Sequence, residues 1–147
     1  MKVALIGASG FVGTAILNEL LQRGHQVTAI VRHPEKVKKA ENLTVVAADV
    51  LDENAVEAAV KGQDAVISAY NAGWTNPDLY NEFIAGAKTI QAAVKKAGIK
   101  RLIVNGGAGS FFIAPHRQIV DTDEFPKEWK AGALGARDYL NILKEEK

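Results

Sequence analysis

The sequence contains no cysteine among its 147 residues. This absence excludes disulfide bonds, thiolate metal sites and a cysteine nucleophile. The three histidines (His25, His33 and His116) are scattered without the spacing of metal ligands, so no metal site is predicted. Neither sign of charge dominates, because 18 basic residues are balanced by 17 acidic ones. Without a strongly charged patch, neither nucleic acid nor a membrane surface is an expected partner.

Long hydrophobic runs are also lacking. No apolar stretch approaches the roughly 20 residues that a membrane-spanning helix needs. The first ten residues, MKVALIGASG, do not have the pattern of a signal peptide. We therefore expect a cytoplasmic protein. The length suits a single domain over residues 1–147, large enough to bury about two thirds of its unfolded surface.

The most informative feature that is present is a glycine pattern. Residues 2–13 read KVALIGASGFVG, where an apolar run leads to three glycines at three-residue spacing. Gly7 suits a tight turn after a strand, Gly10 a close approach of the backbone to a pyrophosphate, and Gly13 tight packing of the next helix. The N–H groups that open this helix favour phosphate. We predict a dinucleotide-binding loop; a strand–helix turn of another α/β protein is the alternative. The predicted loop residues are Gly7, Ser9, Gly10, Phe11, Val12 and Gly13.

Apolar strand-like runs alternate with helix-like segments along the whole chain. Strands are predicted at 3–6, 26–31, 43–47, within 64–70 and at 100–104, and helices at 11–23, 34–39, 53–60, 76–97 and 127–144. The expected N-cap of the third helix is Asp52. The strands lack polar alternation, which is typical of a parallel sheet covered on both faces. Right-handed crossovers then predict a doubly wound Rossmann sheet of about five strands in the order 3-2-1-4-5, with helices on both faces.

The ends of the second and third strands bear on the choice of cofactor. NAD sites usually place an acidic residue after the second strand. This chain has Arg32 there, whose guanidinium suits a 2′-phosphate, so NADP(H) is favoured over NAD(H). The alternative is an ordinary surface arginine. After the third strand, Asp49 could accept a hydrogen bond from the adenine amine and Val50 could cover the ring, or both could form a turn before Asp52.

Five segments together resemble one superfamily. GASGFVG, VRHPEK, AADV, VISAYNAGW and VNGGAGS occur in the order found in atypical or extended short-chain dehydrogenases/reductases. The chain is most similar to members described as NmrA-like, epimerase/dehydratase-like, or NADH-flavin and biliverdin reductase-like. The resemblance implies a Rossmann fold that binds NAD(P)(H), often with hydride transfer to a small organic or flavin-like acceptor. It also implies that Ala69, Tyr70 and Asn71 lie beside the nicotinamide ribose.

The chain departs from this superfamily in its catalytic residues. No lysine stands four residues after Tyr70, Tyr80 or Tyr139, so the usual Tyr-x-x-x-Lys pair is absent. In that pair the lysine lowers the pKa of a tyrosine that acts as the acid. Ser110 is nearest to the usual position of the catalytic serine and is the one catalytic candidate; a loop or cap serine is the alternative.

The chain also departs in length, because members of the superfamily continue beyond the last predicted helix with further strands and part of the substrate pocket. We therefore expect either a fragment, a deliberately shortened or designed chain, or a naturally reduced member, whose fifth strand is an exposed sheet edge. Such an edge, together with the final helix, favours a homodimer.

Three functions are compatible with the sequence. The leading hypothesis is an NADPH-dependent reductase that transfers hydride to a small planar acceptor. The alternatives are a non-catalytic dinucleotide-binding module, acting as a redox sensor or scaffold, and a designed minimal Rossmann domain. The sequence does not identify a substrate, and it leaves open whether the chain is an enzyme.

Overall fold

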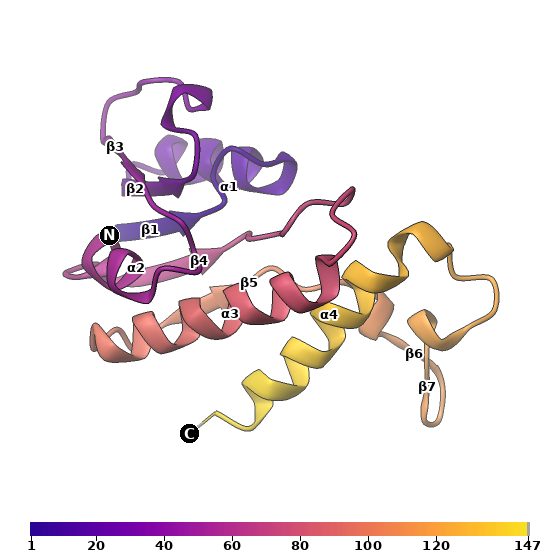
Figure 1. Ribbon diagram of the computed structural model, residues 1–147. Helices are drawn as coiled ribbons and strands as arrows, with labels where there is room; N and C mark the ends of the chain where they lie inside the picture. Colours follow the sequence, from indigo (N-terminus) through magenta and orange to yellow (C-terminus); the bar gives the residue numbers. More distant parts are fainter. Residues whose placement is uncertain (147) are drawn as a thin grey trace. The chain divides into compact units, whose positions relative to one another are not determined.

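The computed structural model describes residues 1–146. Within these residues the main sheet is parallel and has five strands in the order β3-β2-β1-β4-β5, which confirms the predicted topology (Figure 1). The strands are β1 (Lys2–Ile6), β2 (Gln26–Val31), β3 (Leu43–Ala47), β4 (Ala65–Ser68) and β5 (Leu102–Val104). Each strand is a short and largely apolar run, as expected for a sheet that helices cover on both faces.

The α-helices of the described chain are α1 (Phe11–Gln22), α2 (Glu53–Val60), α3 (Leu79–Lys96) and α4 (Lys127–Lys144). Asp52 caps α2 as predicted, because its Oδ1 accepts a hydrogen bond from the Ala55 N–H at 3.1 Å. α3 begins at Leu79, later than predicted, since Asn76 Oδ1 accepts the Asp78 N–H at 2.9 Å and forms a turn first. Within residues 1–146, none of the helices is both long and apolar enough to cross a membrane.

The stretch between β5 and α4 is more regular than the sequence predicted. It contains the 3₁₀ turns η2 (Ala108–Ser110) and η3 (Ile119–Asp121), and the strands β6 (Phe112–Ala114) and β7 (Arg117–Gln118). β6 and β7 pair antiparallel across a turn in which His116 adopts a φ of 63°. His116, and not a glycine, occupies this left-handed position, so the sequence lacks the glycine that usually indicates such a turn. The predicted helix at 34–39 is a shorter 3₁₀ turn, η1 (Pro34–Lys36).

The chain divides into two compact units. The first comprises Met1–Tyr70 and Lys88–Asn105, and the second comprises Asn71–Ala87 and the chain from Gly106 onward. Compact units need not be independently folding domains, so the single domain expected over residues 1–147 stays a prediction.

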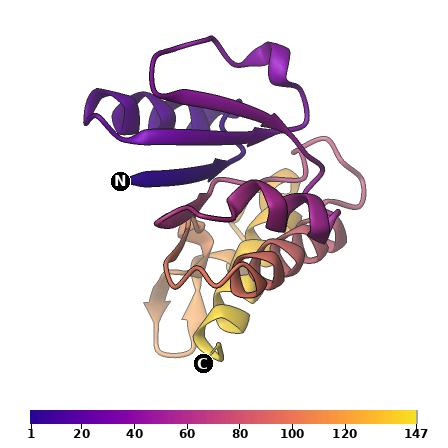
Figure 2. The ribbon, with the colours of Figure 1, turned by 90° about the vertical axis from the view of Figure 1, so that its left-hand side faces the viewer.

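The first unit has an apolar core on each face of its sheet. On one face, Ile6 and Ile30 pack with Val56 of α2 and Ile90 of α3. On the other face, Leu5 and its neighbours pack with Leu17 of α1. Helices therefore cover both faces of the sheet, as predicted (Figure 2).

The second unit packs aromatic side chains against the glycines of α4. Gly135 is buried, and a Cβ atom there would lie 3.0 Å from Cδ1 of Phe83. The Phe83 ring meets the ring of Tyr139 edge to face, with centroids 6.3 Å apart. Small residues in α4 thus allow large rings to approach its backbone closely.

A polar network also holds the second unit together. The Tyr80 hydroxyl donates a hydrogen bond to Asp138 Oδ2 at 2.6 Å. Arg137 Nε donates to Asp138 Oδ1 at 3.0 Å, and a terminal guanidinium nitrogen of Arg137 donates to Asp121 at 2.9 Å. Tyr80 and Arg137 lower the pKa of the Asp138 carboxyl group because both bind its charged form. This network ties α3, α4 and η3 to one another.

Candidate functional site

The glycine loop begins where β1 ends. Gly7 has a φ of 80°, and a Cβ atom there would lie 2.6 Å from the Ala69 carbonyl oxygen. Its N–H donates to the Ile30 carbonyl at 3.1 Å, and its own carbonyl accepts the Gly10 N–H at 3.1 Å. Gly7 therefore forms a tight turn between the ends of β2 and β4, the strands on either side of β1. A side chain at this position would prevent the turn.

Gly13 lets α1 pack directly on this loop. A Cβ atom at residue 13 would lie 1.8 Å from the Gly7 carbonyl oxygen and 2.7 Å from its carbon. These are backbone atoms, which cannot move aside as a flexible side chain can. The close packing of α1 on the loop thus depends on residue 13 having no side chain.

Gly10 differs from the other two glycines of the loop. A Cβ atom at residue 10 would lie 3.5 Å from the Gly7 carbonyl oxygen, which is an ordinary contact. The fold itself therefore tolerates a side chain at this exposed position. A glycine here leaves the backbone bare toward solvent, and this is the feature that the approach of a pyrophosphate requires.

The start of α1 offers free hydrogen-bond donors beside Gly10. Among the described residues, no side chain caps this helix, and its first turn contains no acidic residue. The N–H groups of residues 11–13 have no partner within the helix, because the first turn of an α-helix never supplies one. The Thr14 hydroxyl donates to the Gly10 carbonyl at 2.7 Å and so stabilises the turn. Ser9, Phe11 and Val12 are exposed at this end of the helix.

The end of β4 lies against the same loop. The Ala69 N–H donates to the Ile6 carbonyl at 2.9 Å, and the Ala69 carbonyl faces Gly7. Tyr70 is half-buried and packs on the core of the first unit. Asn71 begins the second unit, where its Oδ1 accepts the Gly73 N–H at 2.7 Å. Ala69 and Tyr70 are thus beside the glycine loop, and Asn71 shapes the loop that follows.

Arg32 lies exposed directly after β2. Among residues 1–146 its guanidinium has no ion pair or hydrogen bond, and the nearby Glu35 carboxylate instead lies 3.4 Å from Nδ1 of His33. The positive charge of Arg32 is therefore not neutralised within the described chain. Arg32 lies at the strand end where a 2′-phosphate would bind.

Asp49 and Val50 follow β3 and form the turn that was one of the two interpretations of the sequence. Asp49 Oδ1 accepts the Leu51 N–H at 2.9 Å. Val50 is only 7% exposed and packs in the core, so little of its side chain is available to an adenine ring. Leu51 is 52% exposed beside it, and sequence reasoning did not single it out. The apolar residue at the end of the segment AADVL was the sequence feature that could have indicated Leu51.

Ser110 lies in the second unit, in the turn η2. Its hydroxyl donates to the Gly107 carbonyl at 2.8 Å, and its own carbonyl accepts a hydrogen bond from the Gln118 side chain at 2.7 Å. The hydroxyl is thereby engaged within its own turn. This geometry favours the cap interpretation of Ser110 over the catalytic one.

Two of the three tyrosines, Tyr80 and Tyr139, are not prepared to act as acids. Burial raises the pKa of Tyr139 to about 12, and among the described residues its hydroxyl has no hydrogen-bond partner. The hydrogen bond to Asp138 raises the pKa of Tyr80. A lysine in the superfamily motif shifts a tyrosine pKa in the opposite direction.

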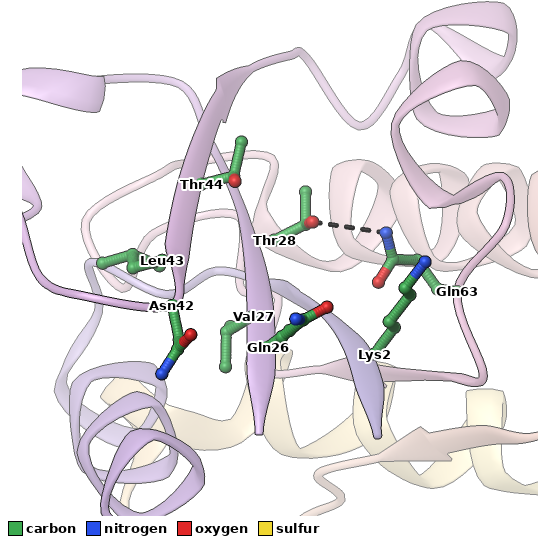
Figure 3. Close-up of a pocket in the computed structure, with 8 residues that line it drawn as sticks. All are labelled: Lys2, Gln26, Val27, Thr28, Asn42, Leu43, Thr44 and Gln63. Atoms are coloured by element: carbon green, nitrogen blue, oxygen red, sulfur yellow. Dashed lines mark hydrogen bonds between the residues drawn. The ribbon is translucent and has the colours of Figure 1, made fainter. Parts of the chain in front are cut away.

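A hollow of about 400 Å³ lies at the amino ends of β1, β2 and β3 (Figure 3). The Gln63 side-chain amide donates to the Thr28 hydroxyl at 3.3 Å within it. Its lining residues are Lys2, Gln26, Val27, Thr28, Asn42, Leu43, Thr44 and Gln63. Since the glycine loop follows the carboxyl end of β1, this hollow lies at the opposite end of the strands.

No group of histidines and carboxylates within residues 1–146 could hold a metal ion.

Comparison with known proteins identifies the family of this chain. Residues 7–141 match the family model described as NAD(P)H-binding. The protein YwnB of Bacillus subtilis is 37% identical over 147 residues, which are 99% of this chain and 66% of that protein.

Two solved structures extend the comparison. A candidate epimerase of Bacteroides thetaiotaomicron has 49% identity and a TM-score of 0.90, with 99% of this chain and 66% of that chain covered. A candidate NADH-flavin reductase of Streptococcus pneumoniae has 34% identity and a TM-score of 0.81, covering 98% and 66%. The chain thus spans just under two thirds of the length of these relatives. It belongs to the NAD(P)H-binding family, an oxidoreductase-type group similar to the short-chain dehydrogenases/reductases, as its motifs predicted.

Proposed function

We propose that this protein binds NADPH and uses it to reduce a small planar acceptor. One observation carries the proposal: the glycine loop leaves the backbone of Gly10 bare beside the uncapped start of α1. Backbone N–H groups and the positive end of a helix dipole favour a diphosphate at such a place.

Arg32 supports NADPH over NADH. Its guanidinium is exposed, always charged and without a partner among the described residues. A 2′-phosphate bound there would form charge-assisted hydrogen bonds, which are worth about 1.5–3 kcal/mol. Asp49 and the exposed side chain of Leu51 would lie at the adenine end of the cofactor.

The chain's own residues would bind and orient rather than perform proton chemistry. Bound NADPH would supply a hydride from C4 of its nicotinamide ring. The balanced reaction is NADPH, acceptor and one proton giving NADP⁺ and the reduced acceptor, with the proton taken from solvent. Neither Tyr80 nor Tyr139 would supply that proton readily, because the pKa of each is raised.

Cofactor binding and turnover test this proposal separately. In calorimetric titrations we expect NADPH to bind more tightly than NADH, and Arg32→Ala to weaken NADPH by about tenfold or more while leaving NADH unchanged. With NADPH bound, a flavin or quinone acceptor should accelerate its oxidation above the background rate without protein. Tighter binding of NADH that Arg32→Ala does not change would contradict the cofactor assignment.

A second candidate is a non-catalytic dinucleotide-binding module. The engaged hydroxyl of Ser110 and the raised pKa of Tyr139 favour it, because neither group is prepared for catalysis. Tight NADPH binding without acceptor turnover would select this candidate.

We also propose that the chain forms a homodimer through the edge of β5 and the final helix, α4. β5 is the last strand of the sheet, and Ile103 on it is 46% exposed. An unpaired strand edge with apolar side chains tends to become an interface. Light scattering over a range of concentrations should give twice the mass of one chain, and a monomer throughout would refute this.

A further inference from the structure

The two faces of the main sheet differ at the amino ends of β2 and β3. On one face, Val27 and Leu43 pack in the apolar core with Leu17 of α1. The next residues along the two strands, Thr28 and Thr44, lie on the opposite face, because side chains alternate along a strand. The strand register places these two threonines directly beside each other. Position near the strand ends alone therefore does not explain the polar side chains, since the adjacent residues are packed in a core.

The hollow of about 400 Å³ lies over this polar part of the sheet (Figure 3). Farther along the same face, Ile6 and Ile30 are buried and pack with Val56 of α2 and Ile90 of α3. The helices thus cover the carboxyl half of this face, and the hollow occupies its amino end. Sites for small molecules have volumes of roughly 300–1,000 Å³, so the hollow is large enough for one. All of its lining residues belong to the first unit.

The lining of the hollow is rich in hydrogen-bond donors. Gln63, in the turn after α2, donates to the Thr28 hydroxyl oxygen at 3.3 Å, so the proton of that hydroxyl remains available to a ligand. Lys2 pairs with Gln26 in the strand register, and its side chain extends toward Gln63 (Figure 3). Among residues 1–146 the Lys2 ammonium has no ion pair or hydrogen bond. None of the described residues that line the hollow is acidic, so the charge there is positive.

We propose that this hollow binds a small anion that carries hydroxyl groups, the chemistry shared by hydroxycarboxylates and sugar phosphates. The Lys2 ammonium would bind the anionic group through a charge-assisted hydrogen bond. The side-chain amides of Gln26 and Gln63 both donate and accept, so they suit the hydroxyl groups of the ligand. The glycine loop follows the carboxyl end of β1, whereas this site lies at its amino end. The proposal therefore does not depend on the cofactor assignment.

Calorimetric titration tests whether the hollow takes such a ligand. Malate, a hydroxycarboxylate, and glucose 6-phosphate, a sugar phosphate, serve as probes in separate titrations, and glucose is the neutral control. We expect saturable binding of at least one anion at one site per chain, with glucose binding about tenfold more weakly because it lacks the charge. The two anions distinguish a carboxylate from a phosphate site. Absence of saturable binding by both anions, or equal binding of glucose, would overturn the proposal.

Two variants identify the groups that bind the anion. Lys2→Met keeps the length of the side chain and should weaken binding about tenfold, because it removes the charge-assisted hydrogen bond. Thr44→Val keeps the shape and the strand preference of the residue, and should weaken binding about fivefold through the lost hydroxyl. Lys88→Met is the matched control, because Lys88 is an exposed lysine on α3 outside the hollow. With melting curves showing that the variants fold, equal affinity of Lys2→Met and Lys88→Met would refute the role of Lys2.

Backbone amide chemical shifts locate the anion without any variant. The glycine loop also favours anions, so the two places must be distinguished. In the wild-type chain without NADPH, a saturating concentration of the anion should shift the N–H signals of Thr28 and Thr44 more than those of residues 11–13. Larger shifts at residues 11–13 would place the anion at the glycine loop and overturn the proposal. Shifts at the two threonines support the site whether or not the chain binds NADPH.

Discussion

Glycines in the two units of this protein do different work. In the first unit, Gly13 lies against the backbone of Gly7, which cannot move aside. In the second unit, Gly132 and Gly135 lie against the rings of Trp74 and Phe83, which can shift. A glycine is therefore indispensable where it packs against backbone atoms, and can be replaced at a lower cost where it packs against a side chain.

The largest effect is expected for Gly13→Ala. Its Cβ atom would lie 1.8 Å from the Gly7 carbonyl oxygen, so either the loop or α1 must move. We expect a loss of about 4 kcal/mol or more in the free energy of unfolding. Thermal melting should show a fall on the order of 10 °C. Gly106→Ala is the matched control, because nothing lies within 4 Å of a Cβ atom there. Equal melting of the two variants would refute the backbone contact.

Gly10→Ala should affect binding and leave folding intact. The new Cβ atom makes only an ordinary contact at 3.5 Å within the protein, and it would occupy the space that a pyrophosphate needs. We expect NADPH affinity to fall by about tenfold or more, since charge-assisted hydrogen bonds to phosphate are worth about 1.5–3 kcal/mol. The NADPH affinity from calorimetry and the melting temperature should be compared between this variant and Gly106→Ala. A large loss of stability with unchanged affinity would reverse the interpretation.

Gly132→Ala should have a smaller effect on stability than Gly13→Ala. The new Cβ atom would lie only 2.6 Å from the Trp74 ring, but the ring of a residue in the loop between β4 and α3 can tilt away. Alanine also favours a helix interior over glycine by about 1 kcal/mol, which offsets part of the strain. We expect a net loss of about 1 kcal/mol in urea unfolding, together with a changed emission spectrum of Trp74. A loss as large as that of Gly13→Ala would contradict the distinction between the two kinds of glycine.

The smallest effect is expected from the polar network of the second unit. The hydrogen bond from Tyr80, together with Arg137, lowers the pKa of Asp138 below its ordinary value of 3.8. A carboxyl group with a depressed pKa stabilises the folded state above its unfolded pKa, and this contribution is lost as the pH falls through the folded value. The contribution of Asp138 to stability should therefore be present in full above about pH 5 and should decline below 3.8.

Tyr80→Phe tests this pH dependence. It removes the hydrogen bond to Asp138 and keeps the ring, so the acid-induced loss of stability should become shallower. Urea unfolding of both proteins at several pH values measures the difference. An identical pH dependence in the two would show that the hydrogen bond does not link protonation to folding.

The sequence predicted the first unit better than the second. Short apolar runs such as residues 27–31 are typical of buried parallel strands, and their alternation with helices leaves few possible orders. The glycine loop was predictable because strand, glycines and helix follow one another within residues 2–22. Local sequence carries this information.

The second unit depends on contacts between residues that are far apart in the sequence. Trp74 rests on Gly132, and Tyr80 binds Asp138, and the two partners are 58 positions apart in the sequence in each case. No periodicity in either segment indicates such pairs. Likewise, the hydroxyl of Ser110 is engaged by the turn that contains it, which its residue type alone does not reveal.

Calorimetric titration of the wild-type chain with NADPH tests the central claim most directly. If the bare backbone at Gly10 and the uncapped start of α1 form a diphosphate site, saturable binding at one site per chain should appear, together with a higher melting temperature. Absence of both heat and thermal stabilisation with NADPH, and likewise with NADH, would contradict this account.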